Sequence, residues 1–285
     1  MTAHLLHAFT MVALGVVAAA IGSLAGLGGG FIVAPALRLI FHLSPAAAAG
    51  TSLVLVLANV ASASLAFYRQ GRIDLRLAVP MGLLAIPGSI GGAYLVRLAP
   101  GAWFDLLYAG LLVVFAIDLW RRPAQHAEGG RAKLPWSRER TFLDKASGTE
   151  FHYVESPPIA AAAGITTGFL SSFFGIGGGV LVVPLLLRLF AMPAHIVSAT
   201  SHTVILFSAP FGVAAHALNG SIDWSDALPL ALGGLAGGQI GAKVSKYLSG
   251  PRLVRILAIV LTVAAASLIG DHLAELPFFS GTHPS

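Results

Sequence analysis

Four long runs without a charged residue constrain the fold of this chain more than any other feature. Residues 39–68, 77–96, 156–187 and 189–222 contain no Asp, Glu, Lys or Arg, and the shortest run is 20 residues long. A helix needs about 20 such residues to cross the hydrocarbon core of a bilayer. The composition agrees, since 56% of the residues are hydrophobic and 10% are charged, whereas soluble domains carry about 25% charged residues. The sequence therefore predicts an all-α, polytopic integral membrane protein embedded in a lipid bilayer.

The chain contains one unit twice, displaced by 149 residues. The glycine cluster GLGGG at 26–30 returns as GIGGG at 175–179, and the register then holds without a gap for more than sixty positions. Other matches are Pro35 with Pro184, Thr51-Ser52 with Thr200-Ser201, Gly71 with Gly220, Asp74 with Asp223, and Pro80 with Pro229. Each unit is predicted to hold an apolar helix, the cluster, a short helix with a proline and three longer spans. In the first unit these elements are expected at 5–25, 29–42, 45–68, 76–98 and 102–120.

The repeat divides the chain into three parts. We expect a first membrane repeat at 1–120, a linker at 121–155 and a second membrane repeat at 156–275. The linker is polar, mixed in charge and broken by Gly and Pro, which is typical of an exposed, partly disordered segment. Ser44-Pro45 and Ser156-Pro157 each place a capping residue before a proline, a pattern that marks where helices begin.

The positions of the 17 Lys and Arg residues predict the orientation in the membrane. If each glycine-cluster segment crosses the bilayer once, the two faces receive 10 and 7 of these cations, which favours neither orientation. If the segment turns back instead, 15 fall on one face, and only Arg38 and Arg97 fall on the other. Because cytoplasmic loops are enriched in Lys and Arg, we expect a cytoplasmic linker and both termini outside the cell membrane. The second unit is then inverted relative to the first, as in many secondary transporters.

Composition and motifs exclude several other classes. The net charge of +5 comes from basic residues between apolar runs, which indicates membrane flanks and no nucleic-acid partner. The chain has no cysteine, which excludes disulfides, thiolate metal sites and cysteine catalysis. The sequence also lacks a dinucleotide fingerprint, an H-E-x-x-H motif and a Walker motif. We therefore expect no enzyme activity, no catalytic residue, no metal and no cofactor.

The two glycine clusters are the main candidate for a binding site. Consecutive glycines let the backbone unwind, and the helix that follows directs N–H groups without intrahelical acceptors at the break. Two helix starts that face each other, each with about +0.5 elementary charge, would favour a small anion. This assigns substrate binding to Gly28, Gly29, Gly30, Gly177, Gly178 and Gly179. The alternative is close packing of helices through small residues.

The matched Thr-Ser pairs are a second candidate. Thr51-Ser52 and Thr200-Ser201 lie about two turns into the helix that follows each short helix, at equivalent depths in the two units. Their hydroxyls would either line a polar cavity and contact the substrate or bond to the backbone of their own helix.

Several single polar residues complete the candidate set. His202 stands where the first unit has Leu53, and an intramembrane imidazole is either an anion-contacting or proton-coupling group or a neutral packing residue. Asn59 and His216 are weaker candidates, because Asn59 could only join helices and His216 could lie near the membrane interface. The arginines that end the short helices, Arg38 and Arg188, are expected to extend to the membrane surface as anchors.

The doubled clusters resemble the sulfite exporter TauE/SafE family of membrane permeases. The resemblance rests on the G-x-G-G-G pattern at 26–30 and 175–179, each with a proline five residues on, and on the two Thr-Ser pairs, and it extends over nearly the whole chain. It implies outward transport of a small sulfur-containing anion or organic acid, such as sulfite, sulfoacetate or a related sulfonate. It does not choose among these substrates.

The predicted function is a secondary transporter, an exporter, that moves a small anion by alternating access. Because no ATP-binding motif is present, the energy would come from a coupling ion, proton or sodium, or from the gradient of the substrate. Two alternatives stay open, an anion channel and a membrane scaffold subunit that transports nothing. Assembly into a homo-oligomer also stays open.

Overall fold

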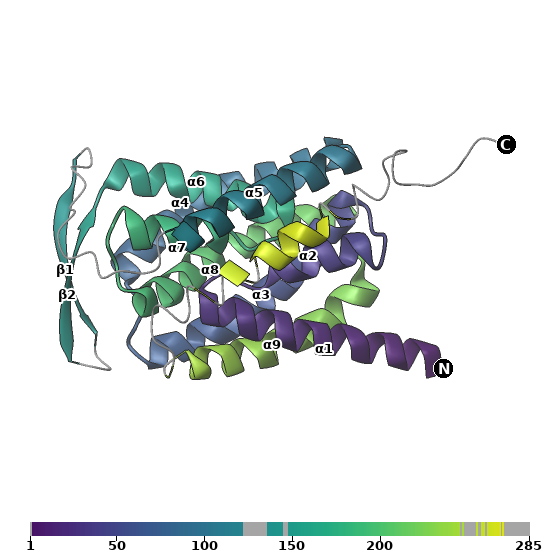
Figure 1. The fold of residues 1–285 in the computed structure, drawn as a ribbon, viewed down its shortest axis with the longest axis horizontal. Helices are drawn as coiled ribbons and strands as arrows, with labels where there is room; N and C mark the ends of the chain where they lie inside the picture. The colour runs from purple at the N-terminus through teal and green to yellow at the C-terminus, as the bar shows by residue number, and fades with distance from the viewer. Residues whose placement is uncertain are drawn as a thin grey trace.

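The computed structural model describes residues 2–121, 136–144, 148–245, 247, 255, 258–259, 261–268 and 270. Its helices run along the longest axis of the molecule, and a pair of strands covers one end of them (Figure 1). The elements before the strands are α1 (Thr2–Ala25), α2 (Gly30–Leu39), α3 (Pro45–Arg69), α4 (Leu75–Leu95), the 3-10 turn η1 (Val96–Leu98) and α5 (Gly101–Arg121). The later elements are β1 (Arg138–Asp144), β2 (Thr149–Glu155), α6 (Pro157–Phe174), α7 (Gly179–Arg188), α8 (Ala194–Leu218) and α9 (Trp224–Val244).

The lengths and surfaces of the helices fit a polytopic membrane protein, as predicted. Five helices of the described part, α1, α3, α4, α5 and α8, are long and apolar enough to cross a bilayer. Large apolar side chains such as Trp103, Leu106 and Leu107 of α5 remain exposed. The helices α2 and α7 have 10 residues each, about 15 Å, which is half the thickness of the hydrocarbon core.

The two units keep the offset of 149 residues in their backbone. The bounds of α2, α3 and α4 become those of α7, α8 and α9 when this offset is added. Residues with positive φ follow the same offset, namely Gly26, Gly28, Gly29, His42 and Gly71 in the first unit and Gly175, Gly177, Gly178, Ala191 and Gly220 in the second. The sequence repeat therefore extends to the conformation of single residues.

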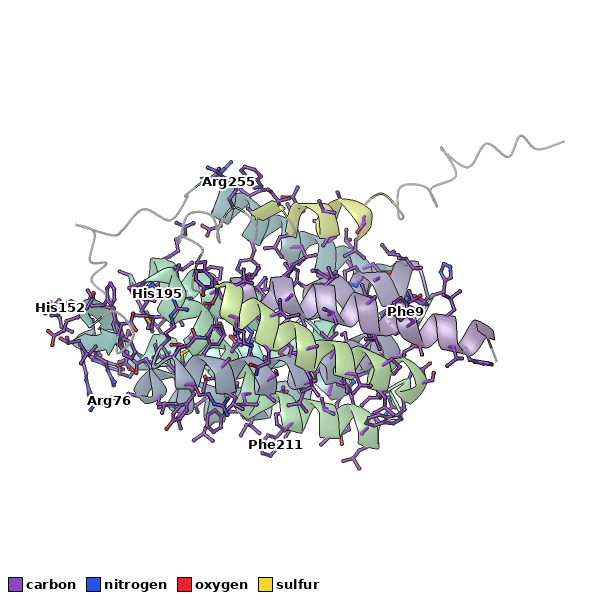
Figure 2. All side chains as sticks on the ribbon, turned by 90° about the horizontal axis from the view of Figure 1, so that it is seen from below. Phe9, Arg76, His152, His195, Phe211 and Arg255 are labelled. Carbon is purple, nitrogen blue, oxygen red and sulfur yellow. The ribbon has the colours of Figure 1, made fainter. Side chains whose placement is uncertain are left out.

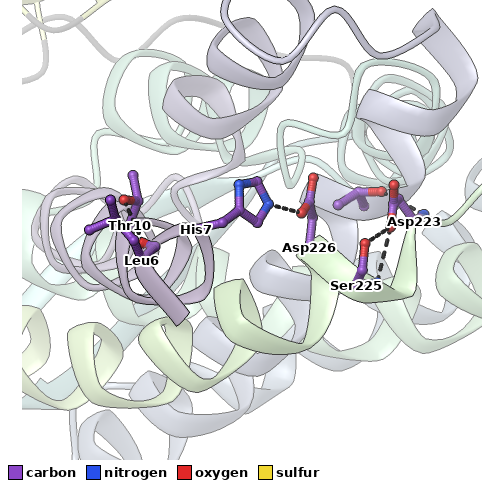
Figure 3. Close-up of polar contacts among 7 residues, drawn as sticks. Leu6, His7, Thr10, Asp223, Ser225 and Asp226 are labelled. Atoms are coloured by element: carbon purple, nitrogen blue, oxygen red, sulfur yellow. Dashed lines mark hydrogen bonds and ion pairs between the residues drawn. The ribbon is translucent and has the colours of Figure 1, made fainter. Parts of the chain in front are cut away.

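One end of the bundle, called here the α1 end, carries the start of α1. His7 Nε2 lies 2.6 Å from Asp226 Oδ1 near the start of α9 (Figure 3). The His7 ring also meets Phe41, just beyond α2, edge-on, with centroids 5.7 Å apart. Arg97, in the turn after α4, hydrogen-bonds Asn219, which follows α8. The start of α1, the end of α2 and the turns after α4 and α8 therefore share this end.

The opposite end, called here the hairpin end, is covered by β1 and β2. The Tyr153 hydroxyl donates to the carboxylate of Asp74 between α3 and α4. Phe151 meets the ring of His195 at the start of α8 edge-on. Figure 2 shows Arg76, His152 and His195 at this end and Phe9 at the other.

Both glycine clusters reverse the direction of the chain. Helix α1 begins at the α1 end and α2 finishes there, because His7 contacts Phe41. Helix α6 begins at the hairpin end and α7 finishes there, because the amide of Val154 donates to the carbonyl of Phe190 across 3.2 Å. The pair α1 and α2 therefore opens toward one end of the bundle and the pair α6 and α7 toward the other.

The most extensive helix contacts join a helix of one unit to a helix of the other. Helix α1 of the first unit packs along α9 of the second, and α6 of the second packs along α4 of the first. In the same way α3 contacts α9 and α8 contacts α4, while α3 and α8 contact each other near the centre. Glycines permit the closest of these contacts, since a Cβ on Gly168 of α6 would lie 1.9 Å from the carbonyl oxygen of Ala85 in α4.

Helix α5 is held near both of its ends by an arginine from a short helix. Arg38 of α2 makes two hydrogen bonds to the carboxylate of Asp105, and Arg188 Nε of α7 donates to Asp118 Oδ2 across 3.0 Å. The two arginines thus bind carboxylates of the protein, and their role as surface anchors stays a prediction. Their guanidinium groups bind carboxylates of the protein because the fork of N–H donors matches a carboxylate in charge and geometry.

The linker contains a β-hairpin, so the prediction of an entirely α-helical chain is wrong at this place. Strands β1 and β2 pair antiparallel, with Phe142 opposite Phe151. Thr, Phe, Tyr and Val side chains favour strands in these segments, but their high charge concealed the pattern. Tyr153 and Glu155 are buried against the helices, so this part of the predicted linker is not an exposed tether. Residues 122–135 and 145–147 of the linker lie outside the described residues.

Removal of the Arg38 guanidinium should destabilise the protein. Arg38→Met leaves the Asp105 carboxylate, which is 6% exposed, without its partner, and an unpaired buried charge costs about 3–5 kcal/mol. We expect a lower midpoint of thermal unfolding in detergent, and recovery of most of the loss when Asp105→Leu is added. Arg97→Met is the matched control, because it loses only an exposed hydrogen bond to Asn219. Equal midpoints in Arg38→Met and the control would contradict the importance of this ion pair.

Candidate functional site

The two glycine clusters meet inside the bundle. All residues of 26–30 and 175–179 are buried. A Cβ built on Gly28 would lie 3.8 Å from the Cα of Gly177. Val56, in the middle of α3, lies against both clusters, since Cβ atoms on Gly28 and Gly177 would lie 3.1 and 2.8 Å from its Cγ1. The structure thus brings the six predicted glycines to one crossing of the chain.

Only glycine fits where the two units touch at this crossing. A Cβ on Gly30, the first residue of α2, would lie 2.0 Å from the carbonyl oxygen of Gly175. A Cβ on Gly179, the first residue of α7, would lie 2.2 Å from the carbonyl oxygen of Gly26. The start of each short helix therefore lies against the end of the long helix that precedes the other cluster. These contacts place a positive helix end beside a negative one.

The serine of each Thr-Ser pair hydrogen-bonds a backbone carbonyl at the helix break of the other unit. Ser201 Oγ donates to the carbonyl of Gly26 across 2.7 Å, and Ser52 Oγ lies 3.0 Å from the carbonyl oxygen of Gly175. Both hydroxyls also lie within hydrogen-bond distance of a carbonyl in the preceding turn. These carbonyls end a helix inside the bundle, so the serines satisfy acceptors that water cannot reach.

The threonines of the same pairs bind the turns of the opposite unit. Thr200 Oγ1 accepts a hydrogen bond from the amide of Asp74 across 3.2 Å. Thr51 Oγ1 accepts one from the amide of Asp223 across 3.0 Å. Both threonines are fully buried. The two pairs are thus equivalent because each threonine binds the turn of the other unit. Contact of the hydroxyls with a substrate stays a prediction.

Asn59 connects the first glycine cluster to α1. Its Nδ2 donates to the carbonyl of Gly28 across 2.8 Å, and its Oδ1 accepts from Ser23 Oγ across 2.6 Å. The side chain is fully buried. Asn59 therefore lies at the candidate site, where it fixes the conformation of the cluster.

The two candidate histidines are fully buried, and each has one ring nitrogen without a partner. His202 Nδ1 lies 2.9 Å from the carbonyl oxygen of Ser198, and its ring meets Phe67 edge-on. His216 Nε2 lies 2.9 Å from the carbonyl oxygen of Ser172. In each neutral ring the nitrogen beside the carbonyl carries the hydrogen, which leaves Nε2 of His202 and Nδ1 of His216 as bare acceptors.

The starts of α2 and α7 direct backbone amides at the crossing without a side-chain cap. The helices α3, α4 and α9 begin with a Ser or Asp side chain that accepts from a first-turn amide. In contrast, α2 and α7 follow Gly29 and Gly178, which have no side chain, and like α6 and α8 they lack a cap from the side chain of the N-cap residue. Their arginines lie at the far end of each helix, about 12 Å from the start. The positive potential at the crossing therefore comes from backbone amides at the helix starts, of which those of Ile32, Gly179 and Leu181 already donate to carbonyls of the clusters.

Two residues that the sequence did not single out lie beside this crossing. A Cβ on Gly178 would lie 2.5 Å from Thr167 Cγ2 and 3.3 Å from Ser171 Cβ. Both hydroxyls are buried and have no hydrogen-bond partner in the described part of the chain. The signal was present in the repeat, because the matching residues of the first unit are Ala18 and Gly22. A residue-by-residue comparison of α1 with α6 would have found this difference.

A second polar region lies at the hairpin end. A cleft of about 820 Å³ lies between β1 and the start of α4, lined by Asp74, Arg76, Glu139 and Arg140 among others. Burial and the neighbouring Asp74 carboxylate raise the pKa of Tyr153, which keeps its hydroxyl a neutral donor. Burial also raises the pKa of Glu155. Because charges of both signs alternate here, this region favours an anion less than the glycine crossing does.

The model of a known protein family matches residues 11–268, which include both clusters and the hairpin. Its description is sulfite exporter TauE/SafE. This chain belongs to that family. This confirms the predicted family, which rested on the glycine clusters and the Thr-Ser pairs.

Relatives of this TauE/SafE protein cover almost its full length. A protein of Bacillus subtilis (strain 168) named "Probable membrane transporter protein YunE" is 32% identical over 270 residues, which are 91% of this chain and 96% of the relative. A "Probable membrane transporter protein" of Xylella fastidiosa (strain 9a5c) is 29% identical, over 92% of this chain and 94% of its own length. No solved structure matches the chain. The chain is thus a member of a membrane transporter family.

Side chains added at the crossing should destabilise this TauE/SafE protein. Gly30→Ala and Gly179→Ala would each place a Cβ within 2.2 Å of a carbonyl oxygen of the other unit, and overpacking of this kind costs about 1–3 kcal/mol. We expect lower midpoints of thermal unfolding for both variants. Gly91→Ala in α4 is the control, because a Cβ there meets nothing within 4 Å. Midpoints that match the control would show that the units do not touch here.

Proposed function

We propose that this TauE/SafE protein is a secondary transporter that exports a small sulfur-containing anion, such as sulfite or an organosulfonate. The anion binds at the crossing of the clusters, between the starts of α2 and α7. The observation that supports this most directly is that both helix starts are buried at one crossing and lack a side-chain cap. The sulfur-containing class follows from the family description, sulfite exporter, and the geometry supports the anion.

Backbone amides suit a transported anion better than a buried cation does. A buried Lys or Arg would hold the anion by full charge, and release would leave that charge unpaired inside the membrane. Helix starts supply partial positive charge and several N–H donors, and they remain tolerable when the anion leaves. Contacts of the substrate with Thr51, Ser52, Thr200, Ser201, Asn59 and His202 belong to the same proposal.

The proposal includes two inverted-topology repeats that move against each other. Its support is that α1 and α2 open toward one end of the bundle and α6 and α7 toward the other, while the packing partners exchange between units. Each helix start lies against a carbonyl of the other unit. An anion that binds there displaces this carbonyl and shifts one unit against the other. Substrate binding is thereby linked to alternating access.

The energy for transport comes from an ion gradient or from the substrate itself in this proposal. His202 supports proton coupling, because its bare Nε2 is fully buried one residue from Ser201, which binds the first cluster. A proton on this imidazole would bring a full positive charge beside the crossing and would favour the anion there. Sodium is the alternative coupling ion.

The proposed orientation places the hairpin end in the cytoplasm and the α1 end outside. The natural chain has no cysteine, so single cysteines can report the side. We expect Glu150→Cys in β2 to react only with a cytoplasmic thiol reagent and Pro100→Cys, after η1, only with an external one. Both residues are exposed. Labelling of both positions from one side would refute the proposed orientation.

Flux into liposomes distinguishes the transporter from its rivals. We expect purified protein to give sulfite flux that saturates with concentration, and Gly178→Leu to reduce it about tenfold or more, because the side chain fills the start of α7. Gly91→Leu controls for the added bulk, since space around Gly91 is open. Flux that rises without saturation would support an anion channel instead. Absence of flux with any tested anion would support a scaffold subunit.

A further inference from the structure

Two buried hydroxyls in α6 lack the hydrogen bonds that other helix hydroxyls of the described residues form. Thr10, Thr166 and Thr203 each donate to the carbonyl four residues earlier, the usual arrangement in membrane helices. Thr167 and Ser171 have no hydrogen-bond partner among the described residues, although both are fully buried. An unpaired buried hydroxyl costs about 1–3 kcal/mol, so their lack of a partner needs an explanation.

The positions of Thr167 and Ser171 explain why their hydroxyls lack a partner. They lie one turn apart, so both project from the same face of α6. That face contacts Gly178, the residue that precedes α7, through Thr167 Cγ2 and Ser171 Cβ. A rotation about χ1 exchanges the methyl and hydroxyl of Thr167, and both rotamers are accessible to threonine in a helix. The hydroxyls therefore lie within a side chain's length of the first turn of α7, where the amides of Gly179 and Leu181 already donate to the carbonyls of Gly177 and Gly178. Ser64 in α3 also lacks a partner, but no recorded contact links it to a helix start.

The two helix starts differ in this respect. The residues equivalent to Thr167 and Ser171 in the first unit are Ala18 and Gly22, and they lie against Gly29 in the same way. The start of α2 therefore has amide donors alone. The start of α7 has amide donors and two neutral hydroxyl donors.

We propose that Thr167, Ser171 and the first turn of α7 form the subsite that selects an oxoanion. This inference rests on the proposed function and assigns the anion to one of the two helix starts. An oxoanion such as sulfite presents several acceptor oxygens, so it can take hydrogen bonds from the helix amides and from both hydroxyls at once. Chloride has one acceptor centre and gains less from donors that converge from two helices. The hydroxyls supply specificity without adding charge.

Substitution of each hydroxyl by a methyl or hydrogen tests the subsite. We expect Thr167→Val and Ser171→Ala each to weaken sulfite binding about tenfold, measured by isothermal titration of the full chain in detergent under anaerobic conditions. Thr166→Val is the matched control, because the Thr166 hydroxyl already donates to Ala162 and is exposed. The control should bind sulfite as the natural protein does, and chloride binding should change little in all three variants.

The outcomes separate this inference from the proposed function. If the natural protein binds neither sulfite nor another oxoanion, the proposed function fails. If it binds sulfite and Thr167→Val and Ser171→Ala match the control, the proposed function stands and the subsite is refuted. If Thr167→Val does not fold, Thr167→Ser and Thr167→Ala replace it, because Ser keeps the hydroxyl and Ala removes it. Equal sulfite affinity in that pair would refute a role of the Thr167 hydroxyl.

Discussion

The structure depends on how two interrupted helices satisfy their backbone inside a bilayer. A break in a helix exposes carbonyl and amide groups, and the hydrocarbon core has no water to bind them. Here the carbonyls of Gly26 and Gly175 accept from serines of the other unit. Each unit thus supplies the hydroxyl that binds the exposed carbonyl of the other unit. Folding of the two halves against each other satisfies both helix breaks. The exchange of packing partners between α1, α4, α6 and α9 follows from the same requirement.

The same contacts explain why the candidate site is both closed and ready for a ligand. The amides at the starts of α2 and α7 lie beside carbonyl groups at the ends of α6 and α1, which balances their partial charges. This balance is weak compared with a full charge, because it involves only the partial charges of helix ends. A small anion can therefore compete for the amides. In the proposed mechanism its entry would change the separation of the units and would connect chemistry at the crossing with motion of the whole molecule.

The sequence predicted the features that are local or repeated, and it missed those that pair distant elements. The predicted spans end within a few residues of α1, α3, α4 and α5, because apolar runs, Ser-Pro starts and glycine breaks act over a single turn. The Ser44 cap forms as expected. The pairing of Arg38 with Asp105 and the bonds of the Thr-Ser pairs join residues far apart in sequence, and no local pattern encodes them. The hairpin was missed because its strands carry as many charges as a typical loop.

The hairpin also affects how the two halves can tilt. It is fastened to the first unit at Asp74 and to the second at Phe190, so it ties together the two turns that would have to part for that end to open. While these fastenings hold, any tilt pivots near the hairpin, and displacement grows with distance from the pivot. The α1 end of the bundle, which is farthest from the hairpin, then moves most. If the two units tilt as proposed, the segment that joins them in sequence thus also makes the α1 end easier to open than the hairpin end.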